Sequence, residues 1–349
     1  MYNRIIKTEA QPSCCIIGLG HSEITDSELF RVVTQEEFIR ELPADTQAVI
    51  CKNGAAIEDV ARTWNEMISE KRTFYGGDLA SLAMFAVNRC FQDVRNRGIE
   101  FDPADIDAVI GATNTGPGYP SLADCVKNGI GIRSDAMCYD VTEACTAGSV
   151  ALFQAQSLIR SGACKKVLVA CAEKATTLTH TVNWQGSNLF GDASFAVLVS
   201  ETDDPAFESF EFFDFNSFPY NGNLSLIRKT ETGFVQEGKK VHLFVVKDVV
   251  ESVVTAIKKA EVILSEIKHL VFHQPSNKTV SSLKDYLIPK WPDFSGIFHK
   301  SEGIGNASSA SFGHLLSKRY HEGIIKANEL IVTCTFGAGL SVGIIGMKL

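Results

Sequence analysis

Three side chains that could act together in acyl-transfer chemistry stand far apart in the sequence. Cys145 lies in YDVTEACTAGS, His273 in LVFHQPSN and Asn306 in EGIGNASSAS. A thiolate is a strong nucleophile, histidine can donate a hydrogen bond or exchange a proton, and an asparagine amide can hold an oxygen. Each residue also has an ordinary structural interpretation, as a buried cysteine, a loop histidine or a helix cap.

The surroundings of Cys145 favour a reactive thiol. A strand-like run ends at Val141, and a helical pattern then continues to Gly162. A thiol at the start of a helix meets the positive end of the helix dipole, which predicts a lowered pKa. The small neighbours Ala144 and Gly148 predict room for a substrate.

The surroundings of His273 suit a functional side chain as well. It follows the apolar run HLVF, and Pro275 prevents the strand from continuing. Open α/β sheets place their chemistry just beyond strand ends, so His273 is expected at such an edge.

A long internal repeat connects these residues. The stretch 102–112, DPADIDAVIGA, resembles 262–273, VILSEIKHLVFH, and the same offset pairs Cys145 with Asn306 (306 − 145 = 161). The two residues are therefore expected to open equivalent helices near a pseudo-twofold axis.

The repeat also predicts the fold. Continuous apolar strands such as those within 165–173 and 328–336 indicate sheets that are covered on both faces. We expect an α/β protein with two pseudo-symmetric halves, residues 1–205 and 206–349, in a layered αβαβα arrangement. Residues 207–241 match nothing in the first half, and we expect them to form an edge strand and an excursion over a substrate pocket.

Composition narrows the classes of function. The 349 residues carry a net charge of −8, which argues against nucleic-acid binding. The sequence has no apolar run long enough to span a bilayer, and its first residues are too polar for a signal peptide. Its ten cysteines form no CxxC pair and no metal-like spacing, so a reducing cytoplasm is expected, with no metal and no cofactor.

Several motifs together resemble the β-ketoacyl-acyl-carrier-protein synthase III branch of the thiolase-like superfamily. The resemblance runs from about Trp64 to the C-terminus. It is carried by DVTEACTAGS, LFGDASFAVLVS, FHQPSNKTV, GIGNASSAS and TFGAGLSVG.

The resemblance implies a role for each residue of the set. Cys145 would take an acyl group from a thioester, and His273 and Asn306 would donate hydrogen bonds to the carbonyl of a malonyl-type extender. Loss of CO2 would leave an enolate that attacks acyl-Cys145 and gives a β-ketoacyl product. The backbone N–H groups of Cys145 and Gly339 would form the oxyanion hole.

The resemblance also implies acyl-coenzyme A or acyl-carrier-protein substrates, docking of a carrier protein, and a homodimer. The residues expected to bind substrate are Arg72, Ser276 and Phe244.

Some positions depart from the family pattern. The tryptophan expected four residues before Arg72 is Ile68, and Ser276 replaces an asparagine that contacts the pantetheine arm. Lys278 replaces an arginine and could meet an acidic carrier protein. These departures favour a carrier-bound acyl group, or a specialised fatty-acid or polyketide pathway.

Three other functions stay open at this level. The same acyl-Cys145 could pass its acyl group to another acceptor without forming a carbon–carbon bond. The chain order Cys, His, Asn also occurs in papain-like hydrolases, although the internal repeat opposes that interpretation. A non-catalytic partner subunit is the third, and the intact set of three residues opposes it.

Overall fold

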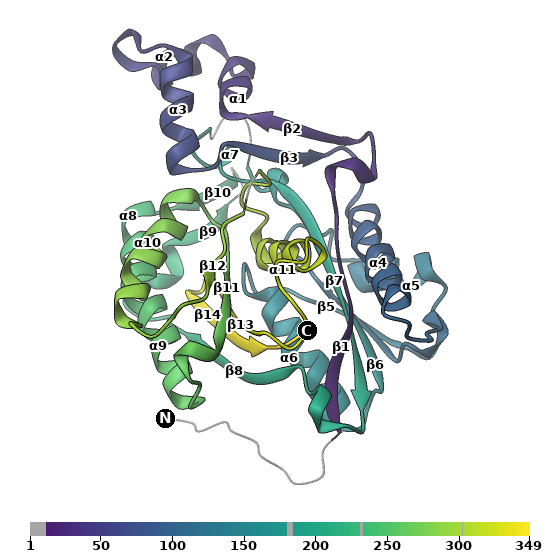
Figure 1. The fold of residues 1–349 in the computed structure, drawn as a ribbon. Coiled ribbons are helices and arrows are strands. Elements are labelled where there is room, and N and C mark those ends of the chain that lie inside the picture. The colour runs from purple at the N-terminus through teal and green to yellow at the C-terminus, as the bar shows by residue number, and fades with distance from the viewer. Residues whose placement is uncertain (1–11, 180–183, 231–232, 302) are drawn as a thin grey trace.

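Two five-stranded sheets form the body of the protein, in a computed structural model that describes residues 12–179, 184–230, 233–301 and 303–349 (Figure 1). The first sheet has the order β1-β7-β6-β4-β5, and the second has the order β12-β11-β13-β14-β8. The strands of the first sheet are β1 (Ser13–His21), β4 (Ala108–Ala112), β5 (Met137–Val141), β6 (Lys166–Lys174) and β7 (Asp192–Thr202). Those of the second are β8 (Phe210–Ser217), β11 (Ile267–Phe272), β12 (Ile297–Phe298), β13 (Leu330–Gly337) and β14 (Ser341–Met347).

The two sheets share one pattern of pairing. In the first, β4 pairs in parallel with β5 and β6, while β7 pairs antiparallel with β6 and β1. In the second, β11 pairs in parallel with β12 and β13, while β14 pairs antiparallel with β13 and β8. The predicted repeat therefore corresponds to a repeated sheet topology.

Helices form three layers around these sheets. The central helices are α6 (Ala147–Arg160) and α11 (Ser311–His321). Over the outer face of the first sheet lie α4 (Leu79–Asn96) and α5 (Leu122–Ile130), and on the side of the second sheet lie α8 (Gly238–Phe244), α9 (Val250–Lys259) and α10 (Asn277–Leu287) (Figure 1). A short helix, α7 (Trp184–Ser187), precedes β7. The predicted αβαβα layering is confirmed.

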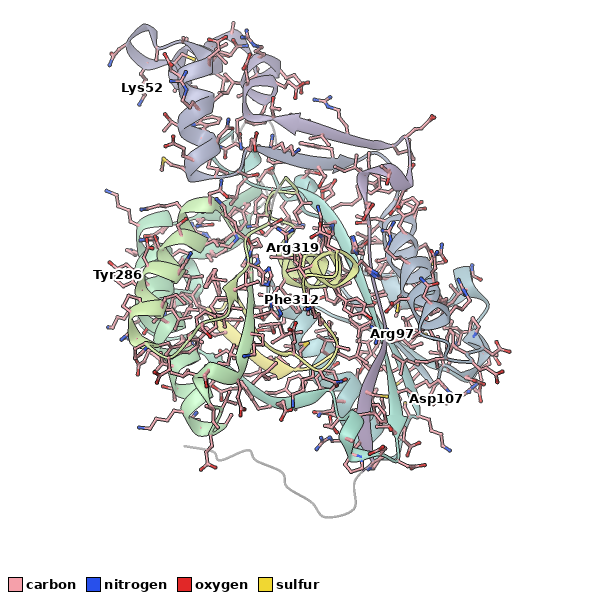
Figure 2. All side chains as sticks on the ribbon, viewed as in Figure 1. Lys52, Arg97, Asp107, Tyr286, Phe312 and Arg319 are labelled. Carbon is pink, nitrogen blue, oxygen red and sulfur yellow. The ribbon has the colours of Figure 1, made fainter. Side chains whose placement is uncertain are left out.

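The layers bury separate parts of the core. The largest apolar cluster lies between the sheets and includes Leu152 and Ile159 of α6 and Phe312 of α11. Phe312 lies at the centre of the molecule, whereas Tyr286 of α10 lies at its periphery (Figure 2). Two further clusters lie between each sheet and its outer helices.

A glycine lets the two central helices approach closely. A Cβ atom at Gly148 would lie 2.9 Å from the Ser309 carbonyl oxygen, closer than real side chains come. Because this contact joins the two halves beside Cys145, the packing of α6 against the start of α11 fixes the relative position of the predicted site residues.

A small unit projects from the top of the molecule between β1 and α4 (Figure 1). It contains β2 (Phe30–Thr34), α1 (Gln35–Glu41), α2 (Ala44–Ile50), α3 (Ile57–Met67) and β3 (Lys71–Tyr75). Thr34 caps α1 by accepting from the Glu37 N–H, and its own N–H donates to the Glu37 carboxylate, a capping box.

The expected excursion over the pocket corresponds to residues after β8, the edge strand of the second sheet. They form the hairpin β9 (Ile227–Thr230) and β10 (Gly233–Gln236), followed by α8. The predicted division at 205/206 falls between β7 and β8 and stays a prediction. Within the described residues, no helix has both the length and the apolar character needed to cross a membrane.

Candidate active site

Cys145, His273 and Asn306 line one cavity of about 290 Å³. Cys145 lies in the turn between β5 and α6, and His273 follows directly after β11. Asn306 lies in the turn before α11. The structure therefore brings together the three side chains that the sequence singled out.

Strained backbone presents the Cys145 thiol. Ala144, the preceding residue, has φ 44°, in the left-handed region that non-glycine residues seldom adopt. The Sγ atom of Cys145 lies 3.7 Å from the Oγ atom of Ser308. A Cβ atom at Gly337 would lie 2.9 Å from the Cys145 backbone nitrogen, so a larger residue there would disturb the turn.

The electrostatics of Cys145 differ from the expectation. Burial raises the pKa of its thiol to about 12, the Ser308 hydrogen bond lowers it and the Glu173 carboxyl raises it. The thiol does precede a helix, as predicted, but the prediction of a lowered pKa is wrong because burial between the two halves outweighs the helix terminus. The resting residue is a thiol, and its proton must leave when an acyl group is taken up.

His273 is a buried, uncharged imidazole. Burial lowers its pKa to about 3, so it is neutral at pH 7. The edge of its ring meets Phe336 at a centroid distance of 5.2 Å. Among the described residues, Nδ1 has no hydrogen-bond partner. An unpaired buried nitrogen on a cavity residue can be satisfied by a substrate atom.

Asn306 is both a cap and a cavity residue. The side-chain Oδ1 of Asn306 accepts from the Ser308 backbone N–H at 2.9 Å. The backbone N–H of Asn306 donates to the Leu189 carbonyl oxygen at 3.0 Å. The bond to Oδ1 fixes the plane of the amide and leaves the Nδ2 group as a donor. The capping and functional interpretations of Asn306 are thus compatible.

The other predicted residues lie at different distances from the cavity. Phe244 lines it, together with Ala338 of the loop after β13. Gly339 is not among the lining residues, whereas Ala338 and Leu340, on either side of it, are. Ser276 caps α10 by accepting from the Thr279 N–H, and Lys278 is exposed on the first turn of that helix.

The structure places Arg72, a predicted substrate-binding residue, away from the cavity. Arg72 is fully buried on β3 and is not among the lining residues. Its guanidinium donates to the Ser187 and Phe190 carbonyls and lies over the rings of Phe38 and Phe74. It therefore fastens the projecting unit to the body of the protein.

One wall of the cavity comes from the segment without a counterpart in the first half. The hairpin contributes Arg228 and Lys229, and α8 contributes His242. Along α8 and the residue that follows it, the lining positions 238, 241, 242 and 245 follow the spacing of one helix face. Once one of these positions is placed at the cavity, that spacing points to His242.

Two further cavity residues lay outside the prediction. Asn114 follows β4, and Ser308 lies two residues after Asn306. The signal that could have found Asn114 is its place beyond a strand end, because that is the argument that identified His273.

Comparison with known proteins assigns the family. Residues 139–216 match the family model 3-oxoacyl-[acyl-carrier-protein] synthase III, and residues 257–349 match the C-terminal model of the same family. The β-ketoacyl-[acyl-carrier-protein] synthase III of Sulfurimonas denitrificans is 30% identical over 266 residues, which is 72% of this chain and 78% of that protein. The chain belongs to the β-ketoacyl-acyl-carrier-protein synthase III family.

Two further proteins match almost the whole chain. The enzyme of the same name from Oceanobacillus iheyensis is 28% identical over 340 residues, which is 95% of this chain and 98% of that protein. The priming β-ketosynthase of the R1128 polyketide pathway superposes with a TM-score of 0.79 at 22% identity, covering 99% of this chain and 98% of that one. The protein is therefore a thiolase-like acyltransferase of the synthase III type.

Proposed function

We propose that this enzyme forms an acyl thioester on Cys145 and condenses it with a malonyl-type thioester, with loss of CO2, to give a β-ketoacyl product. The observation that carries the proposal is the convergence of Cys145, His273 and Asn306 on one cavity. Membership of the synthase III family supports it.

In the first step Cys145 attacks the carbonyl carbon of an acyl thioester. The Cys145–carbon bond forms, the bond to the donor sulfur breaks, and the thiol proton leaves with the donor thiol. The negative charge on the carbonyl oxygen is held by the backbone N–H of Cys145 and by the loop after β13, where Ala338 faces the cavity. Such a donor is worth about 3–4 kcal/mol in the transition state.

In the second step the malonyl thioester carbonyl lies between His273 and Asn306. As a neutral imidazole, His273 donates a hydrogen bond, and the Asn306 Nδ2 group donates a second. The bond between the α-carbon and the carboxylate breaks and releases CO2, and these donors stabilise the enolate that remains. The enolate carbon bonds to the acyl carbon, the bond from that carbon to Cys145 Sγ breaks, and the thiolate takes a proton from solvent.

The cationic wall supports a phosphate-bearing donor. Arg228 and Lys229 are exposed at the cavity, and His242 lies on the adjacent α8. Guanidinium and ammonium groups at a pocket suit the phosphate of a pantetheine arm. We propose that this wall, and not Arg72, meets that phosphate, while Ser276 and Lys278 flank the site on α10 and Lys278 docks the carrier protein.

We further propose a homodimer and a specialised fatty-acid or polyketide pathway in the cytoplasm. At the edge of the first sheet stands β5, whose Met137 is 45% exposed. An exposed edge strand of this kind can pair with a second copy.

Intact mass measurement tests the proposed function. The protein is incubated with a panel of acyl-coenzyme A and acyl-carrier-protein donors, with Cys145→Ala as the control. We expect an adduct of the acyl mass that Cys145→Ala lacks. Absence of a Cys145-dependent adduct with every donor would overturn the proposal.

Release of CO2 after addition of malonyl-carrier protein tests the second step. Asn306→Ala is expected to keep acylation of Cys145 and to lose decarboxylation by about 100-fold or more. Acyl turnover without CO2 would instead indicate simple acyl transfer, and normal condensation by Asn306→Ala would contradict the role of Asn306.

A further inference from the structure

A buried carboxyl lies behind the cavity, near the C-terminal end of β6. Glu173 is fully buried, and its carboxyl accepts from Ser309 Oγ at 2.5 Å, Thr115 Oγ1 at 2.8 Å and the backbone N–H of Asn114 at 3.1 Å. Burial raises the pKa of Glu173, while these donors lower it. A buried carboxyl surrounded by donors holds one position, because moving it would leave polar groups unpaired.

The Asn114 side chain connects this carboxyl to the turn that carries the nucleophile. Its Nδ2 donates to Glu173 Oε1 at 2.7 Å and to the Ala144 carbonyl oxygen at 2.7 Å. An amide nitrogen carries two hydrogens, so these two short bonds use both. The same nitrogen lies 3.4 Å from Ser308 Oγ.

The acceptor of the second bond is the strained residue of the site. Ala144 has φ 44° and directly precedes Cys145. A non-glycine residue keeps this conformation only where its surroundings hold it there. The Ala144 carbonyl oxygen also accepts from the Ala147 N–H at 3.2 Å, at the start of α6. Asn114 is thus the side chain that bonds directly to the strained residue of the turn and connects it to Glu173.

We infer that Asn114, oriented by Glu173, is a positioning residue that holds the turn at Ala144 and thereby fixes the direction of the Cys145 thiol. This inference rests on the proposed role of Cys145. Asn114 reaches the thiol by two routes, through the main chain at Ala144 and past the Ser308 hydroxyl, which lies 3.7 Å from Sγ. Without the amide, the turn is free to relax to negative φ and to swing the thiol away from the cavity.

Alkylation of Cys145 by iodoacetamide tests this role. The rate is followed by mass spectrometry of the peptide that contains Cys145, at several values of pH between 7 and 9.5, in the full-length protein. Asn114→Ala is expected to lower the rate at least about 10-fold at each pH. The matched control is Asn223→Ala. It removes a similar hydrogen bond, from the Asn223 side-chain amide to the Phe218 carbonyl oxygen (2.9 Å), and should leave the rate unchanged.

A second substitution separates positioning from a general structural role. Glycine adopts positive φ readily, so Ala144→Gly in the Asn114→Ala background should let the turn form again. We expect this double variant to recover at least about 3-fold in rate. Asn114→Ser, a smaller change, takes the place of Asn114→Ala if that variant does not fold.

The results decide the inference in each case. A folded Asn114→Ala protein that alkylates within 2-fold of the native rate overturns it, and so does a double variant without recovery. Alkylation needs no acyl donor. Failure of the proposed function would instead appear as the absence of an acyl adduct on the unaltered protein, so the two outcomes are observed separately.

Discussion

The Sγ atom of Cys145 lies 3.7 Å from the Oγ atom of Ser308, a residue of the other half that is 163 positions away. The backbone is left-handed at both places, with φ 44° at Ala144, which precedes Cys145, and φ 46° at Ser308. Each half therefore brings one strained turn to the thiol. Because the two turns come from opposite halves, the reactive group depends on the packing of one half against the other.

Removal of the Ser308 hydroxyl should slow the reaction of the Cys145 thiol with an alkylating agent. The hydrogen bond from Ser308 lowers the pKa of Cys145, so Ser308→Ala should raise that pKa further. At a fixed pH below the pKa, the thiolate fraction falls by about tenfold for each unit by which the pKa rises. We expect iodoacetamide alkylation of Cys145 at pH 8 to slow several-fold.

Ser157→Ala is the matched control for this prediction. The Ser157 hydroxyl donates to the Phe153 carbonyl at 2.8 Å on an exposed part of α6. In the Ser157→Ala variant, Cys145 should be alkylated at the native rate. Equal rates for the two variants would contradict a role of Ser308 in setting the reactivity of Cys145.

Neutralising the cationic wall should weaken binding more than chemistry. Arg228→Gln with Lys229→Gln removes two charges from the cavity wall. We expect KM for a phosphopantetheine thioester to rise about 5- to 20-fold, with kcat changed less than 2-fold and with a weaker dependence of KM on salt. Arg62→Gln, an exposed arginine of α3 paired with Asp59, serves as the control. An unchanged KM would contradict the proposed phosphate contact.

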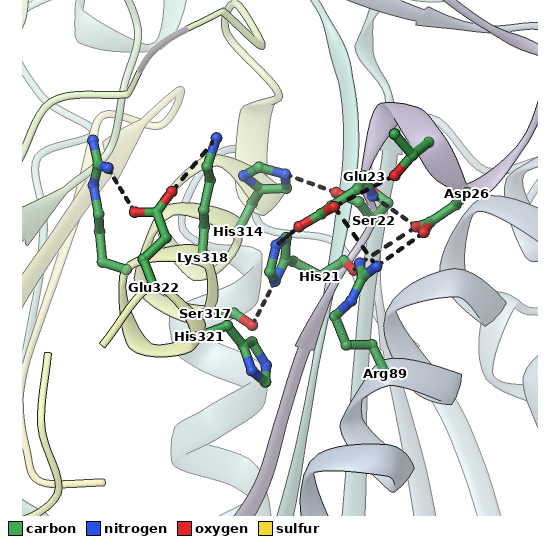
Figure 3. Close-up of polar contacts among 12 residues, drawn as sticks. His21, Ser22, Glu23, Asp26, Arg89, His314, Ser317, Lys318, His321 and Glu322 are labelled. Carbon is green, nitrogen blue, oxygen red and sulfur yellow. Dashed lines mark hydrogen bonds and ion pairs between the residues drawn. The ribbon is translucent and has the colours of Figure 1, made fainter. Parts of the chain in front are cut away.

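Acid should destabilise the fold through its buried histidines. The pKa of His314 is lowered to about 4, and the pKa of His21 is lowered by burial and by the nearby charges of Arg89 and Lys318 (Figure 3). These imidazoles bind protons more readily in the unfolded chain. Their stabilisation is therefore complete above about pH 6.5 and is lost as the pH falls from there towards the lowered values.

Urea unfolding between pH 7 and pH 5 measures this effect. Each such histidine contributes up to about 1.4 kcal/mol per pH unit to the slope of the unfolding free energy. His314→Gln can keep the hydrogen bond to the Ser22 carbonyl, which His314 makes at 2.9 Å, and should make the slope shallower by about that amount. A slope equal to that of the unaltered protein would show that His314 does not titrate in this range.

Enlarging Gly148 should loosen the contact between the central helices. The added Cβ of Gly148→Ala would lie 2.9 Å from the Ser309 carbonyl oxygen and 3.0 Å from the Phe312 ring. Overpacking of this kind costs about 1–3 kcal/mol, seen as a lower Tm. At Gly238 a Cβ meets nothing within 4 Å, so Gly238→Ala should not lower Tm. A Tm for Gly148→Ala equal to that of Gly238→Ala would contradict the prediction.

Much of the fold was predictable because the same pattern of elements occurs twice in the sequence. Two buried strand patterns at one offset predicted the layered halves, and the offset linked Cys145 with Asn306. His273 was identified from a strand end followed by a proline. All of these signals are local, and they repeat.

The features that the sequence did not reveal are properties that the tertiary contacts decide. The pKa of Cys145 is set by burial under the other half, which no neighbouring residue reveals. Arg72 is buried because Phe38 and Phe74 of the projecting unit enclose it.

The unrepeated wall formed by β9, β10 and α8 has an evolutionary consequence. The thiol, the imidazole and the amide belong to the repeated frame, whereas the cations and many of the apolar side chains around the cavity come from a segment present once. Substitutions and insertions in that segment can therefore change which acyl donors fit the cavity without moving the nucleophile or its two partners.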